Sequence, residues 1–226
     1  MLTIIIIIHE LGHCLVALYY KWTIEKIELY PFGGHLVFNN SLNKPLGEEF
    51  MIVISGIVTQ NIFYGLIWFL YNINLLTTYN FNLFTNYHLA IMMFNLMPVF
   101  PLDGAKLLNL LLNKFMPFKV SHKATIYISY LWLFFLIILI IKYYYNINFY
   151  LIIILILTKV ISEHKSHDYI FNAFLLERFL KPDGNKKTLV LKNKTINNMF
   201  RNYKHLFIIN SQSFSERYLL KIRFRG

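Results

Sequence analysis

Residues 2–20 read LTIIIIIHELGHCLVALYY, an apolar run that nevertheless holds His9, Glu10 and His13 in its middle. A transmembrane helix needs about 20 predominantly apolar residues, and this run has that length and composition. An ionisable side chain in the middle of such a helix costs about 2.5–3.5 kcal/mol on insertion scales, so it is a functional candidate by default. The run therefore predicts both a membrane span and a site that compensates for burying these three side chains.

The composition of the whole chain is that of an integral membrane protein. The 226 residues are 57% hydrophobic and 15% charged, with a mean hydropathy of +0.48, whereas soluble domains carry about 25% charged residues. We expect an all-α polytopic membrane protein with about five transmembrane helices, in a transmembrane core that covers residues 1–162. The predicted spans are residues 2–20, 51–71, 87–112, 124–145 and 148–162.

Two further segments are expected to fold outside the spans. Within residues 21–50, KIELYPFGGHLVF alternates apolar and polar residues on each side of Gly33–Gly34, which predicts a short membrane-associated β-hairpin. Pro31 would keep its strand at a sheet edge. Residues 163–226 are predicted to form a small cytoplasmic appendage in which FLLERFL is helical and TLVLKN and HLFIIN are strands.

The positions of Lys and Arg predict how the spans are oriented. Residues 159–226 hold fourteen Lys and Arg against five Asp and Glu, a surplus of nine out of the net charge of +11, whereas residues 72–86 hold no basic residue. Basic segments stay on the cytoplasmic side of a membrane. We therefore expect a multi-pass protein, surrounded by the lipid bilayer, with a cytoplasmic C-terminus. This topology explains the basic tail, so we expect no nucleic-acid partner.

His9, Glu10 and His13 form the H-E-x-x-H pattern. Positions four apart on a helix lie on the same face, so both imidazoles can bind one metal ion while Glu10 lies beside it. Two imidazoles and a carboxylate suit a zinc ion, which lowers the pKa of water to about 7, and Glu10 can accept a proton from that water during attack on a carbonyl. We expect one zinc ion per chain. The structural alternative is a buried His–Glu–His polar cluster that holds helices together.

A third metal ligand is expected from a distant part of the chain. Asp103, in FNLMPVFPLDGAKLL, is the only acidic residue between Glu49 and Glu163, and it lies in an apolar stretch. Pro98 and Pro101 interrupt the helix immediately before it, which lets a carboxylate turn towards the interior of the helix bundle. Asp103 is also suited to cap the helix that begins near GAKLL, and the two roles are compatible.

Other polar and small residues of the apolar segments allow more than one role. Asn95 could make an interhelical hydrogen bond or contact a substrate amide or oxyanion. Gly12 and Gly56 are expected to permit close helix packing. The remaining histidines have no ligand spacing within an apolar span, so we expect them at the surface or the membrane interface. They are His35, His88, His122, His164, His167 and His205.

Taken together, the two motifs resemble those of the site-2 protease family of intramembrane zinc metalloproteases. The family's signatures are HExxH in one transmembrane helix and a later Asn…Pro-x-x-Pro-Leu-Asp-Gly segment. Here they are His9-Glu10-Leu11-Gly12-His13 and NLMPVFPLDG at residues 95–104. The stretches YPFGGHLVF, KPLGEEF and FLLERFL resemble the sporulation branch of this family, and the similarity covers about residues 4–180.

The resemblance implies roles for individual residues and for the whole chain. His9, His13 and Asp103 would bind zinc, Glu10 would be the general base, and Asn95 would hold the substrate or the oxyanion. The family cleaves membrane-associated proteins within or near the bilayer. In the sporulation branch the substrate is the pro-sequence of a sigma factor, membrane proteins regulate or inhibit the protease, and the membrane is that of the mother cell around the forespore. The tail would then be a partial CBS-like module.

Two other functions fit the same residues. A general site-2 protease would cut anti-sigma factors or signal-peptide remnants, but many of those relatives carry a PDZ-sized insertion that is not apparent here. A metal transporter or a non-catalytic membrane scaffold could use the same His–Asp cluster. Transporters usually contain internal repeats, and none is visible in this sequence.

Overall fold

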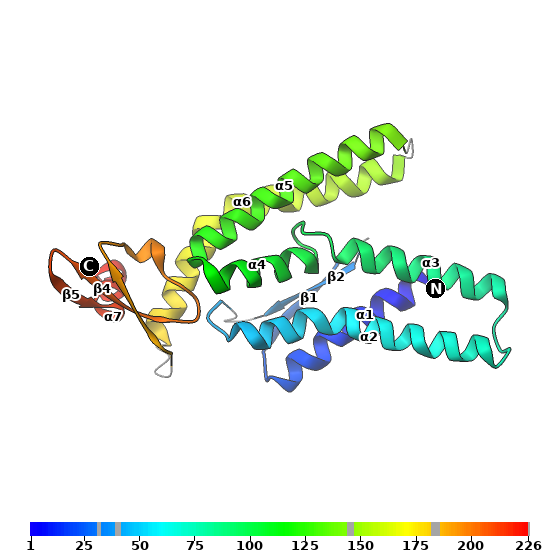
Figure 1. Ribbon diagram of the computed structural model, residues 1–226, viewed down its shortest axis with the longest axis horizontal. Coiled ribbons are helices and arrows are strands. Elements are labelled where there is room, and N and C mark those ends of the chain that lie inside the picture. The colour runs from blue at the N-terminus through cyan, green and yellow to red at the C-terminus, as the bar shows by residue number, and fades with distance from the viewer. Residues whose placement is uncertain (31–32, 39–41, 144–146, 182–185, 226) are drawn as a thin grey trace. The chain divides into compact units, whose positions relative to one another are not determined.

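The computed structural model describes residues 1–30, 33–38, 42–143, 147–181 and 186–225, and it is mostly helical (Figure 1). It divides into two compact units. The N-terminal unit consists of Met1–Asn39 and Gly47–Leu107, and the C-terminal unit consists of Asn40–Leu46 and Leu108–Gly226.

Three helices in the described part of the chain are long and apolar enough to cross a membrane. They are α1 (Leu2–Tyr19), α2 (Leu46–Asn72) and α5 (Phe118–Tyr143). These helices correspond to the first, second and fourth predicted spans, so the expectation of a helical membrane protein is confirmed. A total of five spans stays a prediction for the other two segments.

The β-hairpin predicted within residues 21–50 is present in the N-terminal unit. Strand β1 (Ile24–Tyr30) pairs antiparallel with β2 (Gly33–Phe38), and Tyr30 at the end of β1 lies opposite Gly33 at the start of β2. Pro31, which we expected to keep its strand at a sheet edge, lies outside the described residues. The short alternating pattern around Gly33 therefore predicted the strand pairing correctly.

The third predicted span, residues 87–112, consists of two helices. Helix α3 (Thr78–Asn95) begins nine residues before this segment, because the Thr77 hydroxyl accepts a hydrogen bond from the Asn80 N–H at 3.3 Å and so caps a polar first turn. Residues 96–102 then leave the helix, with a cis peptide between Phe100 and Pro101. Helix α4 (Asp103–Phe115) begins at the expected aspartate.

Helices α5 and α6 (Ile147–Leu180) of the C-terminal unit form the expected antiparallel pair. His122 Nδ1 lies 2.8 Å from His167 Nδ1, whereas Tyr130, further along α5, lies 3.4 Å from the earlier His164 of α6. The turn predicted to join them falls partly on residues 144–146, which lie outside the described residues. Helix α6 continues without a break past residue 162, where we expected the membrane core to end.

The expectation that the other histidines lie at a surface or interface is wrong for four of them. These are His88, His122, His167 and His205, each at most 8% exposed. Each is buried together with a hydrogen-bond partner, which offsets the loss of hydration; His205 Nδ1, for example, lies 2.9 Å from a Glu216 carboxylate oxygen. His164 is exposed as expected, and the side chain of His35 lies outside what the structure describes.

The end of the chain folds as a small α/β module in the C-terminal unit. Its central strand pairs parallel with the strand before it and antiparallel with the strand after it. Two of these strands fall on the predicted TLVLKN and HLFIIN segments. The elements are β3 (Thr188–Lys192), the 3₁₀ turn η1 (Ile196–Asn198), β4 (Lys204–Ile209), β5 (Gln212–Ser215) and α7 (Glu216–Arg225).

The module shares one apolar core with the neighbouring ends of α5 and α6. The buried members of this core are Phe118, Phe171, Phe174, Leu175, Leu191, Met199, Phe207 and Leu220. A segment of about sixty residues buries too little apolar surface for a large core of its own. The side chains from α5 and α6 therefore supply part of the core that holds the module together.

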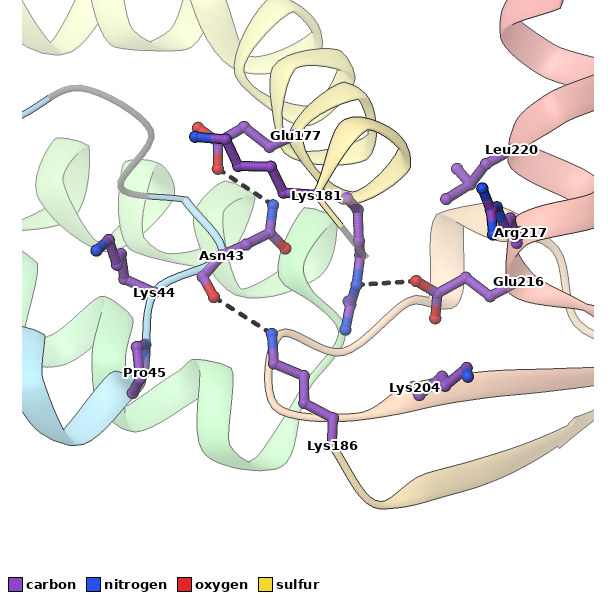
Figure 2. Close-up of a pocket in the computed structure, with 11 residues that line it drawn as sticks. Asn43, Lys44, Pro45, Glu177, Lys181, Lys186, Lys204, Glu216, Arg217 and Leu220 are labelled. Carbon is purple, nitrogen blue, oxygen red and sulfur yellow. Dashed lines mark hydrogen bonds and ion pairs between the residues drawn. The ribbon is translucent and has the colours of Figure 1, made fainter. Parts of the chain in front are cut away.

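A pocket of about 370 Å³ lies in the C-terminal unit, and six Lys and Arg but only two Glu line it (Figure 2). The Arg178 guanidinium forms an ion pair with Glu216 at 2.9 Å, and both side chains are less than 10% exposed. On the opposite wall, Asn43 donates a hydrogen bond to Glu177, and the Asn43 carbonyl accepts one from Lys186. These bonds attach the segment that precedes α2 to α6 and to Lys186, just before the module.

We expect Glu216→Gln to destabilise the full chain at pH 7 by about 3 kcal/mol, because it leaves the buried charge of Arg178 uncompensated. Burial raises the pKa of Glu216, but the hydrogen bond from His205 and the charge of Arg178 outweigh it, and the net pKa is lowered. Because the pKa of Glu216 is lower in the folded state than in the unfolded state, its carboxylate stabilises the fold. This stabilisation is complete above the unfolded-state pKa of about 4.3 and is lost as the pH falls through the folded-state pKa. The melting temperature of Glu216→Gln should therefore be lower than that of the wild type at pH 7, and the difference should disappear in acid. Glu25→Gln, at an exposed position, is the control and should melt like the wild type throughout.

Candidate metal centre

Three metal-binding atoms meet inside the N-terminal unit. His9 Nε2 and His13 Nε2, one helical turn apart on α1, are 3.1 Å from each other. Asp103 Oδ2 lies 2.9 Å from the first and 3.0 Å from the second. All three residues are buried, with exposed fractions of 1%, 5% and 5%. The structure thus joins the H-E-x-x-H helix to an aspartate ninety residues later in the chain.

The dimensions of this group fit a zinc ion. Zinc binds His nitrogen and carboxylate oxygen at about 2.0–2.2 Å in tetrahedral geometry, which separates neighbouring ligand atoms by about 3.3 Å. The three distances of 2.9–3.1 Å in the centre are close to that separation. Small outward shifts of the three side chains would therefore let them bind a zinc ion.

The hydrogen bonds on the far sides of the two rings also favour a cation. His9 Nδ1 lies 3.1 Å from Gln60 Oε1, and His13 Nδ1 lies 2.7 Å from the Ile52 carbonyl oxygen. Because these oxygens can only accept, each neutral ring carries its hydrogen on Nδ1 and directs a lone pair from Nε2 into the centre. With both rings neutral, three buried acceptors face one another, and a cation between them would offset their repulsion.

Asp103 is held by its own helix and by the turn before it. It is the first residue of α4, and its second carboxylate oxygen, Oδ1, accepts a hydrogen bond from Lys106 Nζ at 3.0 Å. The next residue, Gly104, runs so close to the preceding turn that an added Cβ would lie 2.1 Å from the Leu96 carbonyl oxygen. The turn therefore needs glycine there, and Asp103 both begins the helix and presents Oδ2 to the imidazoles.

The two glycines of α1 and α2 that we expected to permit packing differ in what they touch. A Cβ on Gly12 would lie 2.7 Å from the Ser55 carbonyl oxygen of α2, so this glycine permits close approach of the helices. A Cβ on Gly56 would lie 2.4 Å from His13 Nε2 and 2.8 Å from His9 Nε2. Gly56 thus leaves the space that the imidazoles occupy.

The remaining two candidate residues lie next to the centre. Asn95, the last residue of α3, places its side-chain nitrogen 3.5 Å from His9 Nε2. Glu10 follows His9 on α1 and is partly buried. The structure therefore brings the side chains of His9, His13, Asp103 and Asn95 together, whereas Glu10 is placed only by its position next to His9 on α1.

Two residues at the centre were missed in the sequence. Gln60 is fully buried and bonds to His9, and Lys106 bonds to Asp103. A glutamine in the middle of an apolar span was a usable signal, because burying an unpaired amide is costly. Lys106 lies three residues after Asp103, a spacing that brings helical side chains together.

The chain is similar to known metalloproteases. The family described as Peptidase family M50 matches residues 1–75. Stage IV sporulation protein FB of Bacillus subtilis is 34% identical over 185 residues, which cover 79% of this chain and 62% of that protein. A zinc metalloprotease of Methanocaldococcus jannaschii is 32% identical over 118 residues, which cover 50% of this chain and 34% of that protein.

A solved structure is similar over much of the chain. The site-2 protease from Methanocaldococcus jannaschii has a TM-score of 0.57 and 26% sequence identity, with coverage of 72% of this chain and 74% of that one. The present chain spans less than two thirds of the length of the two curated relatives. These matches bear out the resemblance that the motifs predicted: residues 1–75 match Peptidase family M50, and the chain is similar to site-2 proteases over most of its length.

Proposed function

We propose that this protein is a zinc-dependent intramembrane protease that hydrolyses a peptide bond of a membrane-associated protein. The observation that carries this proposal is the convergence of three buried ligand atoms within 3.1 Å of one another. The similarity to known proteins supports the same chemistry, because the matching relatives include a zinc metalloprotease. His9, His13 and Asp103 would hold one zinc ion per chain.

The metal, Glu10 and Asn95 would have different roles in the reaction. When bound, zinc supplies Lewis acidity, which polarises a carbonyl and lowers the pKa of water to about 7. Glu10 accepts the proton of the attacking water and returns it to the leaving amine. The Asn95 amide nitrogen, 3.5 Å from a ligand atom, donates a hydrogen bond towards the oxygen that becomes negative, a contact commonly worth about 10²–10³-fold in rate.

The substrate and setting are proposed from the relatives and from the charge pattern. The similarity to stage IV sporulation protein FB supports the pro-sequence of a sporulation sigma factor as the substrate, with membrane regulatory or inhibitory proteins as partners. The basic tail supports a cytoplasmic C-terminus in the bacterial inner membrane, and a mother-cell membrane around the forespore would suit that substrate. A partial CBS-like identity of the tail stays a prediction.

Purified full-length protein should contain about one zinc per chain, and Asp103→Ala should lose both zinc and cleavage, because a catalytic zinc site needs three protein ligands. The measurement is metal analysis of detergent-purified protein, combined with co-expression of candidate substrates. Cleavage of a pro-sigma factor but not of a membrane anti-sigma factor is expected. The reverse preference would favour a general site-2 protease. Zinc flux into vesicles without cleavage of either substrate would favour a transporter.

A further inference from the structure

A chain of buried hydrogen bonds extends from the metal centre into α2 and α3. The Gln60 side chain of α2 accepts a hydrogen bond from His9 Nδ1 at 3.1 Å through its oxygen. Its amide nitrogen lies 2.9 Å from the His88 carbonyl oxygen and 3.2 Å from His88 Nδ1, both on α3. One glutamine therefore connects a metal-binding ring on α1 to two acceptors on α3.

Only one placement of the hydrogens satisfies this chain. The His88 carbonyl oxygen can only accept, so the group facing it must be the amide nitrogen of Gln60. The Gln60 oxygen then points at His9, which must donate from Nδ1 and keep its lone pair on Nε2. His88 Nδ1 accepts the second amide hydrogen and carries its own hydrogen on Nε2. Every polar atom of the Gln60 side chain has a partner.

The surroundings hold this arrangement in place. Gln60 is 0% exposed and His88 is 2% exposed, so water cannot substitute for a lost hydrogen bond. The His88 ring stacks on Tyr64, with ring centroids 4.4 Å apart and planes 13° apart. Reversal of the amide would place its oxygen against a carbonyl oxygen and its hydrogens against His9 Nδ1. The buried α3 carbonyl thus selects the orientation of Gln60, and Gln60 selects the tautomer of His9.

We propose that Gln60, oriented by His88, is a positioning residue that fixes the tautomer and ring orientation of His9 and so sets the affinity of the centre for zinc. This inference rests on the proposed function, because it assumes that the centre binds zinc. Outer hydrogen-bond partners of metal-binding histidines commonly contribute 10–100-fold to metal affinity. Without the Gln60 oxygen, the His9 ring can carry its hydrogen on Nε2, which removes one lone pair from the centre.

Three variants and one control test this role in the full-length protein. Gln60→Leu removes both ends of the connection, whereas Gln60→Glu keeps an acceptor oxygen for His9. His88→Phe keeps an aromatic ring against Tyr64 and the backbone carbonyl at position 88, and removes only the ring nitrogen. The control is Asn61→Leu, because Asn61 is exposed and bonds to the Ile57 carbonyl of its own helix. The measurements are the zinc dissociation constant by chelator competition, the absorption spectrum of the cobalt-loaded protein, and the melting temperature of the zinc-free protein.

Gln60→Leu is expected to weaken zinc binding by about 10–100-fold and to change the cobalt spectrum. Gln60→Glu keeps the acceptor for His9 but sets its second oxygen against the His88 carbonyl, so it should bind zinc more tightly than Gln60→Leu and more weakly than the wild type. His88→Phe should fall between Gln60→Leu and the wild type, and Asn61→Leu should match the wild type. Unchanged zinc affinity in Gln60→Leu, with only a lower melting temperature of the zinc-free protein, would overturn the positioning role and leave the proposed function intact. Zinc binding by Gln60→Glu no tighter than that of Gln60→Leu would also overturn it. A wild-type protein that binds no zinc would overturn the proposed function and this inference together.

Discussion

Glu10→Gln is expected to keep about one zinc per chain and to lose cleavage by about 10²–10⁴-fold, the usual contribution of a general base. Glutamine has the shape of glutamate but cannot accept a proton from water at neutral pH. The three atoms that would hold the metal belong to His9, His13 and Asp103, so this change leaves them in place. The measurement is zinc content together with the rate of substrate cleavage in the same detergent-purified sample.

The matched comparison is His13→Ala, which removes a ligand and should lose zinc and cleavage together. The contrast between the two variants separates a proton acceptor from a metal ligand. Loss of zinc in Glu10→Gln would mean that Glu10 supports the centre structurally. Cleavage at the wild-type rate by Glu10→Gln would remove Glu10 from the reaction altogether.

Gly56→Ala is expected to weaken zinc binding by more than about 100-fold, beyond the usual effect of an outer partner, and to abolish cleavage. The added methyl group would lie 2.4 Å from His13 Nε2 and 2.8 Å from His9 Nε2, so at least one ring must leave the centre. Alanine is the better helix former by about 0.8–1.0 kcal/mol, so helix propensity alone would stabilise α2. The measurement is zinc affinity alongside thermal melting of the zinc-free protein.

Gly65→Ala is the natural control, because Gly65 lies on the same helix with no atom within 4 Å of an added methyl group. It should bind zinc like the wild type and melt at the same or a slightly higher temperature. Normal zinc affinity in Gly56→Ala would show that the two imidazoles do not have to occupy the space that this glycine leaves.

Much of the fold could be predicted because its causes lie close together in the sequence. The apolar runs gave α1, α2 and α5, and the alternation around Gly33–Gly34 gave the hairpin. The start of α3 was missed, because its first turns carry asparagine and tyrosine and its beginning depends on a hydrogen bond to Thr77. The buried histidines were missed for a related reason. A histidine can be buried when a distant group pairs with it, as Glu216 does with His205.

The sequence by itself determined that His9 and His13 share one face of an apolar helix, because the spacing of four residues acts within a single helical turn. It also singled out Asp103, the one acidic residue in a long apolar stretch. Only the tertiary structure decided that this carboxylate lies 3.0 Å or less from both rings, that Gly56 leaves room for them, and that Gln60 connects His9 to His88. These relations arise where α1, α2, α3 and the beginning of α4 meet. The approach of packed helices depends on side chains from all of them, so no single segment encodes it.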